Sequence, residues 1–276
     1  MEDALNNVLI TGGSGFLGEG LIDELLRRGV RRICIYSRSE YRQHMLRSRF
    51  QSDTLRWFIG DVRDVDRLRR AMYGIDTVIH AAALKRIEVG EYNPSEMFAT
   101  NIQGSQNVLD AAEQAGVRRA VLVSSDKAYQ PVSPYGISKA AAEALFRRHS
   151  GRLETVVVRY GNVAGSTGSV IPTWREIQGV VRVTDPTCTR FWMSREHAVE
   201  WVLGAVSCPR DREVLIPTSL PAFRLMDLAT AMNREYTIIG LPEHEKLHES
   251  MGPGLSSDQA RRMSVNEIKE ELKRVP

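Results

Sequence analysis

The sequence predicts an α/β fold, a doubly wound parallel sheet followed by a small C-terminal lobe. Short apolar runs alternate with amphipathic helical patterns as far as residue 159, a glycine-rich loop follows the first run, and the order is less regular from residue 160 onward. With 276 residues, 42% of them apolar and 26% charged, the chain can bury a full core. We therefore expect residues 1–159 to form the sheet domain and residues 160–276 mainly a smaller lobe, in one integrated unit.

The first predicted strand, residues 7–10, leads into a glycine-rich loop and then a helix. Gly12, Gly15 and Gly18 match a dinucleotide fingerprint, in which the glycines permit a tight turn, close approach of the backbone to a pyrophosphate and close helix–strand packing. The N–H groups at the start of the helix favour an anion. The pattern predicts a Rossmann-type sheet whose cofactor contacts include Gly12, Ser14, Gly15, Phe16, Leu17 and Gly18.

The second predicted strand, residues 32–36, ends at Ser37 and Arg38. Enzymes that use NAD usually carry Asp or Glu at this point, to bind the ribose 2′-hydroxyl. A hydroxyl and a guanidinium suit a 2′-phosphate instead, so we expect NADP to be the cofactor. The competing interpretation is that Arg38 is one more solvated arginine in an arginine-rich chain.

The next two predicted strands, at residues 57–62 and 76–83, bring further residues to the cofactor. Asp61 is placed to accept a hydrogen bond from the adenine amine, and small residues allow the cofactor to lie against the backbone. His80, inside the apolar run, and Cys34, inside the second strand, are interpreted as core residues. The expected cofactor contacts in this region are Asp61, Val62, Ala81, Ala82, Ala83 and Lys85.

The fifth predicted strand, residues 120–123, ends at Ser124-Ser125-Asp126-Lys127, and a helix over about residues 134–149 carries Tyr135 and Lys139. A Tyr and a Lys four apart share one helix face, and a cation lowers the pKa of a phenol from about 10 toward a working range for a base. Ser125 is placed to hold a substrate hydroxyl. Asp126 and Lys127 are not needed to oxidise an alcohol, but an acid and an amine are needed to eliminate water beside a new ketone. The alternatives are that Asp126 caps the loop and that Lys127 is exposed.

Composition limits the partners. The net charge is only +3, and the three cysteines lack paired or metal-type spacing. We see neither a signal segment nor a long apolar span. We therefore expect a cytoplasmic, soluble protein that has no metal ion and binds neither nucleic acid nor a membrane.

Together these motifs resemble the extended short-chain dehydrogenase/reductases and, among them, the inverting UDP-N-acetylglucosamine 4,6-dehydratases of polysaccharide and pseudaminic acid biosynthesis. The matching segments cover most of the chain and include residues 58–64, 80–85, 91–94, 100–102, 159–163, 168–172, 189–192 and 245–249. The chain departs from the family pattern at Thr167, where an arginine is usual, and has no arginine just before Glu245. The resemblance therefore leaves the exact sugar nucleotide open.

The resemblance implies a chemistry and a set of binding residues. Tyr135, helped by Lys139, removes the C4 hydroxyl proton while Ser125 orients that hydroxyl; Lys127 takes the C5 proton, and Asp126 protonates the departing C6 hydroxyl. Hydride passes to tightly bound NADP and returns to C6, so the cofactor is regenerated in each cycle. Tyr135 and Lys139 also contact the cofactor. The residues expected to bind the UDP-sugar are Lys85, Asn101, Asn162, Val170, Arg190 and Glu249.

Two other functions fit the same residues. One is a C5-retaining dehydratase or a nucleotide-sugar epimerase on the same fold, and the other is a catalytically inactive NADP-sensing regulator. The resemblance also implies a homo-oligomer. The helices near residues 94–115 and 134–149 offer an apolar surface for it that includes Ile137, Ala141, Ala144 and Leu145.

Overall fold

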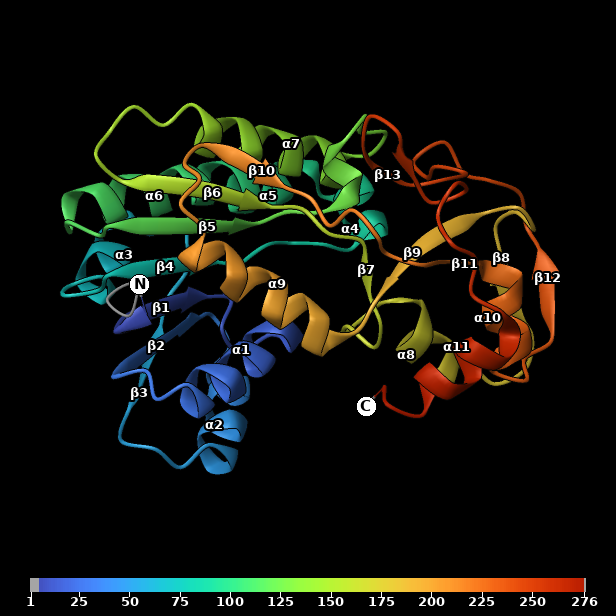
Figure 1. Cartoon of the computed structure of the whole chain (residues 1–276), viewed down its shortest axis with the longest axis horizontal. Coiled ribbons are helices and arrows are strands. Elements are labelled where there is room, and N and C mark those ends of the chain that lie inside the picture. The colour runs from blue at the N-terminus through green and yellow to red at the C-terminus, as the bar shows by residue number, and fades with distance from the viewer. Residues whose placement is uncertain (1–4, 276) are drawn as a thin grey trace.

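The computed structural model describes residues 5–275, which form two lobes side by side (Figure 1). The larger lobe is built on a seven-stranded parallel sheet with the order β10-β6-β5-β4-β1-β2-β3. Its strands are β1 (Asn7–Thr11), β2 (Arg32–Ser37), β3 (Leu55–Ile59), β4 (Thr77–His80), β5 (Arg119–Val123), β6 (Glu154–Val158) and β10 (Glu213–Leu215). The first six strands have the 3-2-1-4-5-6 order of a Rossmann fold, so the predicted fold class is confirmed.

Helices cover both faces of this sheet, as the crossovers between parallel strands require (Figure 1). One face carries α1 (Phe16–Arg27), α2 (Glu40–Arg49) and α9 (Arg195–Ser207), and the other carries α3 (Val65–Ala71), α6 (Gly104–Gln114) and α7 (Pro134–Arg147). Neighbouring strand residues enter different cores: Val8 and Ile10 pack with α1 and α9, whereas Leu9 packs with α3 and α6. This alternation is the two-residue period of a strand buried on both faces.

The smaller lobe is assembled around short strands. It contains β7 (Asn162–Val163), α8 (Val170–Glu176), β8 (Val181–Val183), β9 (Thr189–Met193), β11 (Ala222–Arg224), α10 (Leu225–Ala231), β12 (Tyr236–Ile238), β13 (Ser250–Gly252), β14 (Leu255–Ser256) and α11 (Val265–Leu272). Trp192 and Phe223 meet edge to face in its core, with ring centres 5.5 Å apart. Between these elements the chain returns to the larger lobe as α9 and β10, so the two lobes are interleaved along the sequence.

The long helix expected over residues 94–115 is present but is not uniform. It consists of α5 (Pro94–Phe98), a π-helical turn (Ala99–Gln103) and α6. Turns of this kind insert an extra residue and often occur at functional sites. The turn contains Asn101, whose buried amide bonds the segment after β4 and also Ser138 on α7.

Two expected core residues are confirmed. His80 is 1% exposed, and its ring nitrogens lie 2.7 Å from Thr11 Oγ1 and 3.0 Å from Ser105 Oγ. Burial lowers the pKa of His80 to about 3, so the ring is neutral. Cys34 is 2% exposed within β2. Among residues 5–275, no helix has the length and apolar character to span a membrane, and no cluster of His, Cys, Asp and Glu is arranged to hold a metal ion.

Candidate active site

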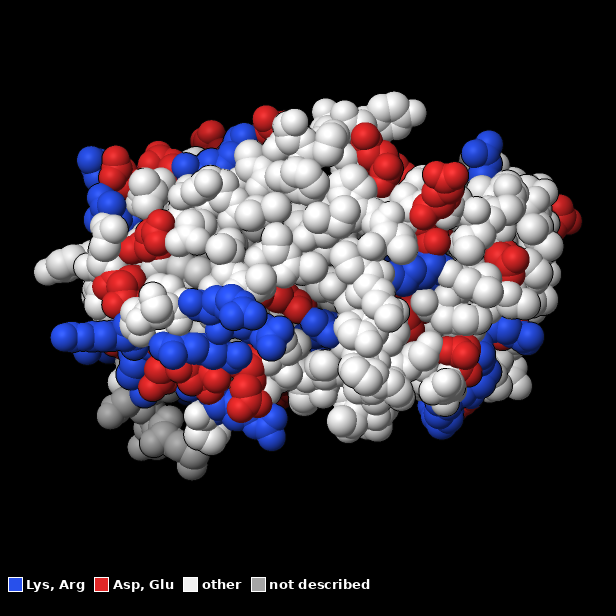
Figure 2. Space-filling view, turned by 90° about the horizontal axis from the view of Figure 1, so that it is seen from above, with Lys and Arg blue, Asp and Glu red and all other residues white. Residues whose placement is uncertain are grey.

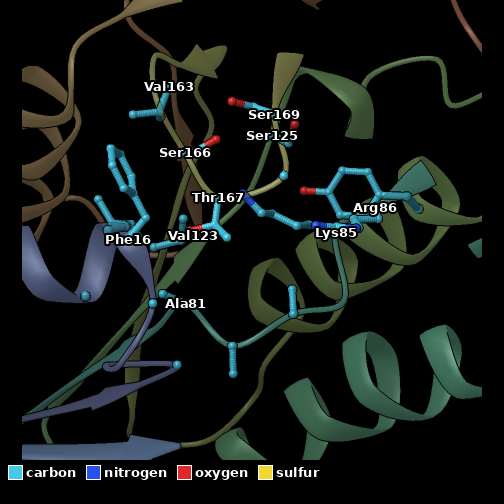
Figure 3. A pocket seen from close by; sticks show the side chains of 18 of the residues that line it. Phe16, Ala81, Lys85, Arg86, Val123, Ser125, Val163, Ser166, Thr167 and Ser169 are labelled. Atoms are coloured by element: carbon cyan, nitrogen blue, oxygen red, sulfur yellow. The ribbon is translucent and has the colours of Figure 1, made fainter. Parts of the chain in front are cut away.

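A cavity of about 540 Å³ lies at the carboxyl ends of the sheet strands, where parallel sheets of this type bind ligands (Figure 3). One wall comes from the glycine loop and the ends of β2, β4 and β5, and the opposite wall comes from residues 160–170 at the start of the smaller lobe. In Figure 3, Phe16 and Ala81 mark the first wall, and Val163, Ser166 and Ser169 mark the second.

Two of the three fingerprint glycines, Gly12 and Gly18, have no room for a side chain. Gly12 has a φ of +69°, and a Cβ atom there would come within 2.8 Å of the Ala82 backbone. A Cβ at Gly18 would come within 2.4 Å of the Gly13 carbonyl oxygen. The loop therefore folds tightly between β1 and α1, leaving an open backbone cradle that fits the pyrophosphate of a dinucleotide. All six loop residues expected to contact the cofactor line the cavity.

The end of β2 carries hydroxyl and guanidinium groups and no carboxylate. Ser37 Oγ accepts hydrogen bonds from Ser14 Oγ at 2.8 Å and Gln43 Nε2 at 2.9 Å. Arg38 lines the cavity with 52% of its side chain exposed and lies 3.7 Å from Asp61 Oδ2. Arg42, one turn later on α2, also lines the cavity. The sequence analysis missed Arg42, although its spacing of four from Arg38 was a usable signal.

Asp61 is the one expected cofactor contact that the cavity lining does not include. Its carboxylate pairs with Arg63 at 2.8 Å, and its main-chain carbonyl accepts from the Tyr36 hydroxyl at 2.7 Å. Hydrogen bonds and the charge of Arg63 hold the pKa of Asp61 below its usual value despite the partial burial that opposes this. A contact with adenine therefore stays a prediction.

The 3₁₀ turn after β5 and the N-terminus of α7 bring the expected catalytic residues together. A 3₁₀ turn (Asp126–Ala128) follows β5 and is capped by Ser125, whose Oγ accepts from the Lys127 amide at 3.3 Å. Helix α7 begins at Pro134, where Ser133 Oγ accepts from the Gly136 amide at 3.2 Å. As a result Ser125, Lys127, Tyr135 and Lys139 all line the cavity, and the Tyr135 phenol is hydrogen-bonded to Ser125.

Asp126 lies behind this wall, fully buried and outside the cavity lining. Its Oδ1 accepts from Ser125 Oγ at 2.8 Å and from Lys127 Nζ at 3.1 Å, while its Oδ2 has no hydrogen-bond partner among residues 5–275. Burial, assisted by the negative charge of Glu249, raises the pKa of Asp126. Its environment therefore makes Asp126 a weaker acid than an exposed aspartate.

Lys127 is held by two carboxylates and an amide. Its Nζ lies 3.1 Å from Asp126 Oδ1, 3.3 Å from Glu249 Oε1 and 3.2 Å from Asn162 Oδ1. Burial alone would lower the pKa of Lys127, but Asp126 and Glu249 outweigh it and raise that pKa above the ordinary value. This environment favours the ammonium form of Lys127, whereas a base at this position needs the free amine.

The Tyr135–Lys139 pair differs in detail from the expected arrangement. Lys139 is buried and donates to the Val123 carbonyl, and burial lowers its pKa to about 8. Burial also raises the pKa of Tyr135, and the cation that opposes this rise is Lys127. In this geometry Lys127, and not Lys139, supplies the positive charge that lowers the pKa of the Tyr135 phenol.

A second buried ion pair supports the site and was missed by the sequence analysis. Glu143, four residues after Lys139 on α7, accepts from Ser124 Oγ at 2.5 Å and from Arg159 Nε at 3.0 Å. Arg159 also donates to the Met251 carbonyl in the smaller lobe and lies over the Tyr129 ring at 5.7 Å. The network joins the ends of β5 and β6 to α7 and β13.

The expected substrate residues separate into two groups. Lys85, Asn162 and Val170 line the cavity. Asn101, Arg190 and Glu249 do not, because their polar groups are bound to protein: Asn101 to Leu84 and Ser138, Arg190 to Glu245 at 3.1 Å, and Glu249 to Lys127 and Lys246. Glu249 is 3% exposed, so in this structure it supports Lys127 from behind the wall.

Comparisons with known proteins agree with this geometry. Residues 8–270 match the family described as polysaccharide biosynthesis protein. The chain is 44% identical over 266 residues to a UDP-N-acetylglucosamine 4,6-dehydratase (inverting) of Campylobacter jejuni subsp. jejuni, covering 92% of this chain and 78% of that protein. It is 37% identical over 262 residues to a UDP-glucose 4-epimerase of Rickettsia conorii, covering 88% of this chain and 76% of that protein.

Solved structures show the same architecture. Pen from Bacillus thuringiensis superposes with a TM-score of 0.90 at 32% identity, over 98% of both chains. A dTDP-glucose 4,6-dehydratase from Streptomyces venezuelae, with NAD and TYD bound, superposes with a TM-score of 0.84 at 21% identity, over 97% of this chain and 96% of that one. At 21% identity, the similarity to the Streptomyces venezuelae structure shows a shared fold only.

The network of Ser124, Glu143 and Arg159 leads to a stability prediction. Glu143→Ala should lower the free energy of unfolding by about 3–5 kcal/mol, because it leaves the Arg159 guanidinium buried and unpaired. Glu270→Ala is the control: its pair with Lys273 at 2.7 Å is exposed, with 68% of each side chain accessible. This control should cost about 1 kcal/mol or less. Urea unfolding would measure both values, and equal losses would contradict the assigned role of Glu143.

Proposed function

Because the chain belongs to the polysaccharide biosynthesis protein family, we propose that it is a nucleotide-sugar 4,6-dehydratase acting on UDP-N-acetylglucosamine with inversion at C5. The observation that carries the proposal is that Lys127 lies beside Tyr135 on the wall of a cavity with a dinucleotide cradle, with Asp126 paired to it at 3.1 Å from behind that wall. A plain alcohol dehydrogenase has no use for this additional acid and amine.

The residues around the cavity fit a nicotinamide dinucleotide, with the glycine loop at its pyrophosphate and Tyr135 and Lys139 toward its nicotinamide end. When bound, this cofactor would supply the acceptor for the hydride that C4 of the sugar loses and the donor of the hydride that C6 gains. Tyr135 takes the proton of the C4 hydroxyl. Ser125, hydrogen-bonded to that phenol, holds the hydroxyl in place, and the Lys127 ammonium favours the phenolate.

The elimination step falls to the cluster of Asp126, Lys127 and Glu249. Among the three, Lys127 is the group on the cavity wall, so it is the group that meets the sugar. To accept the C5 proton it must first release its own, and the two carboxylates at 3.1 and 3.3 Å are the acceptors within reach. The cluster as a unit removes one proton from C5 and supplies one to the C6 oxygen, which leaves as water, so its proton count is unchanged.

We expect the purified protein, incubated with UDP-N-acetylglucosamine in deuterated water, to release one water from the sugar and place a deuteron at C5. Lys127→Ala should keep cofactor affinity but lower turnover about 10²–10⁴-fold, as loss of a general acid–base group does. Mass spectrometry and proton NMR measure both, and the C5 coupling separates inversion from retention. Lys273→Ala, at an exposed position, is the control.

Several outcomes would overturn parts of this assignment. Normal deuterium exchange at C5 in Lys127→Ala would refute the role of Lys127. Deuterium gained with unchanged substrate mass would indicate an epimerase. A bound cofactor without turnover of any sugar nucleotide would indicate the sensing regulator.

For the cofactor we propose NADP. Ser37, Arg38 and Arg42 gather where a 2′-phosphate would lie, and no carboxylate ends β2. Structures with the same fold bind NAD, as the Streptomyces venezuelae enzyme does, so the choice rests on these side chains.

Replacement of Arg38 tests the cofactor proposal directly. Arg38→Gln should weaken NADP binding by about 10–100-fold, the value of a charge-assisted hydrogen bond, and leave NAD binding unchanged. Arg47→Gln, on α2 but outside this cavity, should change neither. Fluorescence titration of the wild type and both variants with each dinucleotide gives six constants, and equal effects of Arg38→Gln on NAD and NADP would refute the role of Arg38.

We also propose a homo-oligomer that associates through α7. This helix lies along the upper edge of Figure 1, and Figure 2, which views the molecule from that side, shows a broad area free of Lys, Arg, Asp and Glu. Ile137 is 47% exposed on the helix. Light scattering should give a mass of at least twice 31.0 kDa, reduced by Ile137→Asp but not by Tyr73→Asp in the turn after α3. A monomer would contradict the proposal.

A further inference from the structure

Cations that line the cavity differ in whether they have a partner. Lys127 is paired with Asp126 and Glu249, Lys139 donates to a main-chain carbonyl, and Arg38 lies near Asp61. The side chains of Arg42, Lys85 and Arg86 have neither an ion pair nor a hydrogen bond with residues 5–275. Glu88 also lines the cavity but is not within ion-pair distance of them. Unpaired cations on a cavity wall are the groups available to an anionic ligand.

These three cations are close enough to affect one another. Desolvation and the positive charges of Arg86 and Arg42 lower the pKa of Lys85 to about 8. Among the described residues, no carboxylate offsets the repulsion between these cations. An anion bound beside them would offset it.

Arg86 spans the cavity from one wall to the other. Its backbone precedes α4 (Ile87–Tyr92) in the larger lobe, while its guanidinium lies against Gly168 in the smaller lobe. A Cβ atom at Gly168, whose φ is +73°, would come within 2.7 Å of Arg86 Nε. Figure 3 shows Lys85, Arg86 and Thr167 in the same part of the cavity. Arg42, by contrast, lies with Arg38 at the end of β2.

Hydroxyl groups on the facing loop complete this part of the cavity. Ser166, Thr167 and Ser169 line it, and Ser169 Oγ is a buried atom with no hydrogen-bond partner among residues 5–275. A buried hydroxyl without a partner is costly unless a ligand or water satisfies it. The loop therefore offers the Ser169 hydroxyl as a hydrogen-bond donor, near the Arg86 guanidinium, on the wall opposite the glycine loop.

We propose that Arg86 binds the diphosphate of the nucleotide-sugar substrate and holds it against the loop of residues 166–169. This rests on the proposed function, because it requires a nucleoside diphosphate substrate. A guanidinium presents two parallel N–H groups, and this geometry suits the phosphate oxygens of a diphosphate. The assignment makes Arg86 a substrate-binding residue with no part in the proton transfers.

The test compares UDP with UMP on protein saturated with cofactor, because the two probes share the base and ribose and differ in one phosphate. Wild-type protein should bind UDP more tightly than UMP. Arg86→Gln should weaken UDP binding about tenfold or more, the cost of a charge-assisted contact, while UMP affinity changes much less. In turnover, the KM for the sugar nucleotide should rise by a similar factor with little change in kcat.

A second substitution separates lost charge from disturbed structure. Thr167 adjoins Gly168, so Thr167→Arg introduced into Arg86→Gln returns a guanidinium to the same loop and should recover most of the UDP affinity. Arg47→Gln is the control: it removes an exposed arginine of α2 that lies outside this cavity, and it should leave the ratio of UDP to UMP affinity unchanged.

The outcomes distinguish this inference from the proposed function. If wild-type protein binds UDP and Arg86→Gln binds it equally well, the assignment of Arg86 is wrong and the dehydratase proposal stands. If Arg86→Gln weakens UDP and UMP by the same factor, Arg86 does not recognise the diphosphate. If wild-type protein binds cofactor but no nucleoside diphosphate, the proposed function fails and the assignment fails with it.

Discussion

The ammonium group of Lys127, shared between two carboxylates from different lobes, is the interaction on which the site depends. Asp126 belongs to the turn after β5, whereas Glu249 lies just before β13. A second link to β13 comes from Arg159, which follows β6, pairs with Glu143 on α7 and donates to the Met251 carbonyl. These two ionic links fix the smaller lobe over the ends of the strands, and so they define the cavity between them.

Magnitudes explain the charge states in this cluster. A charge pair at 3.3 Å is worth about 5 kcal/mol at an effective dielectric constant of about 20, while burial of one ammonium costs several kcal/mol. One carboxylate therefore roughly offsets the burial of Lys127, and two outweigh it, which raises its pKa. The two carboxylates compete for the Lys127 ammonium, but Glu249 also lies near the cations Arg190 and Lys246. Asp126, the more deeply buried of the two, has the raised pKa, and Glu249, with Lys246 as a second cation, has the lowered one.

Local features were predictable from the sequence, and the charge states were not. The glycine loop, the strand ends at Ser37 and Val123 and the start of α7 follow from spacing within a few residues, because turns and caps are local. Asp126 and Lys127 were recognised as neighbours in the sequence. That Lys127 faces the cavity while Asp126 lies behind its wall depends on the orientation of the 3₁₀ turn, which the sequence does not encode locally. Glu249 was expected at the substrate and instead supports Lys127, a contact between residues 122 positions apart that no periodicity encodes. Likewise, Arg86 was passed over because its significance depends on contact with Gly168.

The pairing of each cation in the cavity indicates what it can do. A cation already paired with carboxylates gains little from a further anion, but it can exchange protons with its partners, as Lys127 can with Asp126 and Glu249. A cation without a partner has no acceptor for a proton, and it gains the full interaction when an anion arrives. The described structure places the carboxylate-paired Lys127 beside Tyr135, while Arg42, Lys85 and Arg86 line the same cavity without a partner. Proton transfer and anion binding are thus assigned to different side chains, so substitutions at Lys127 and Arg86 should alter separate kinetic constants.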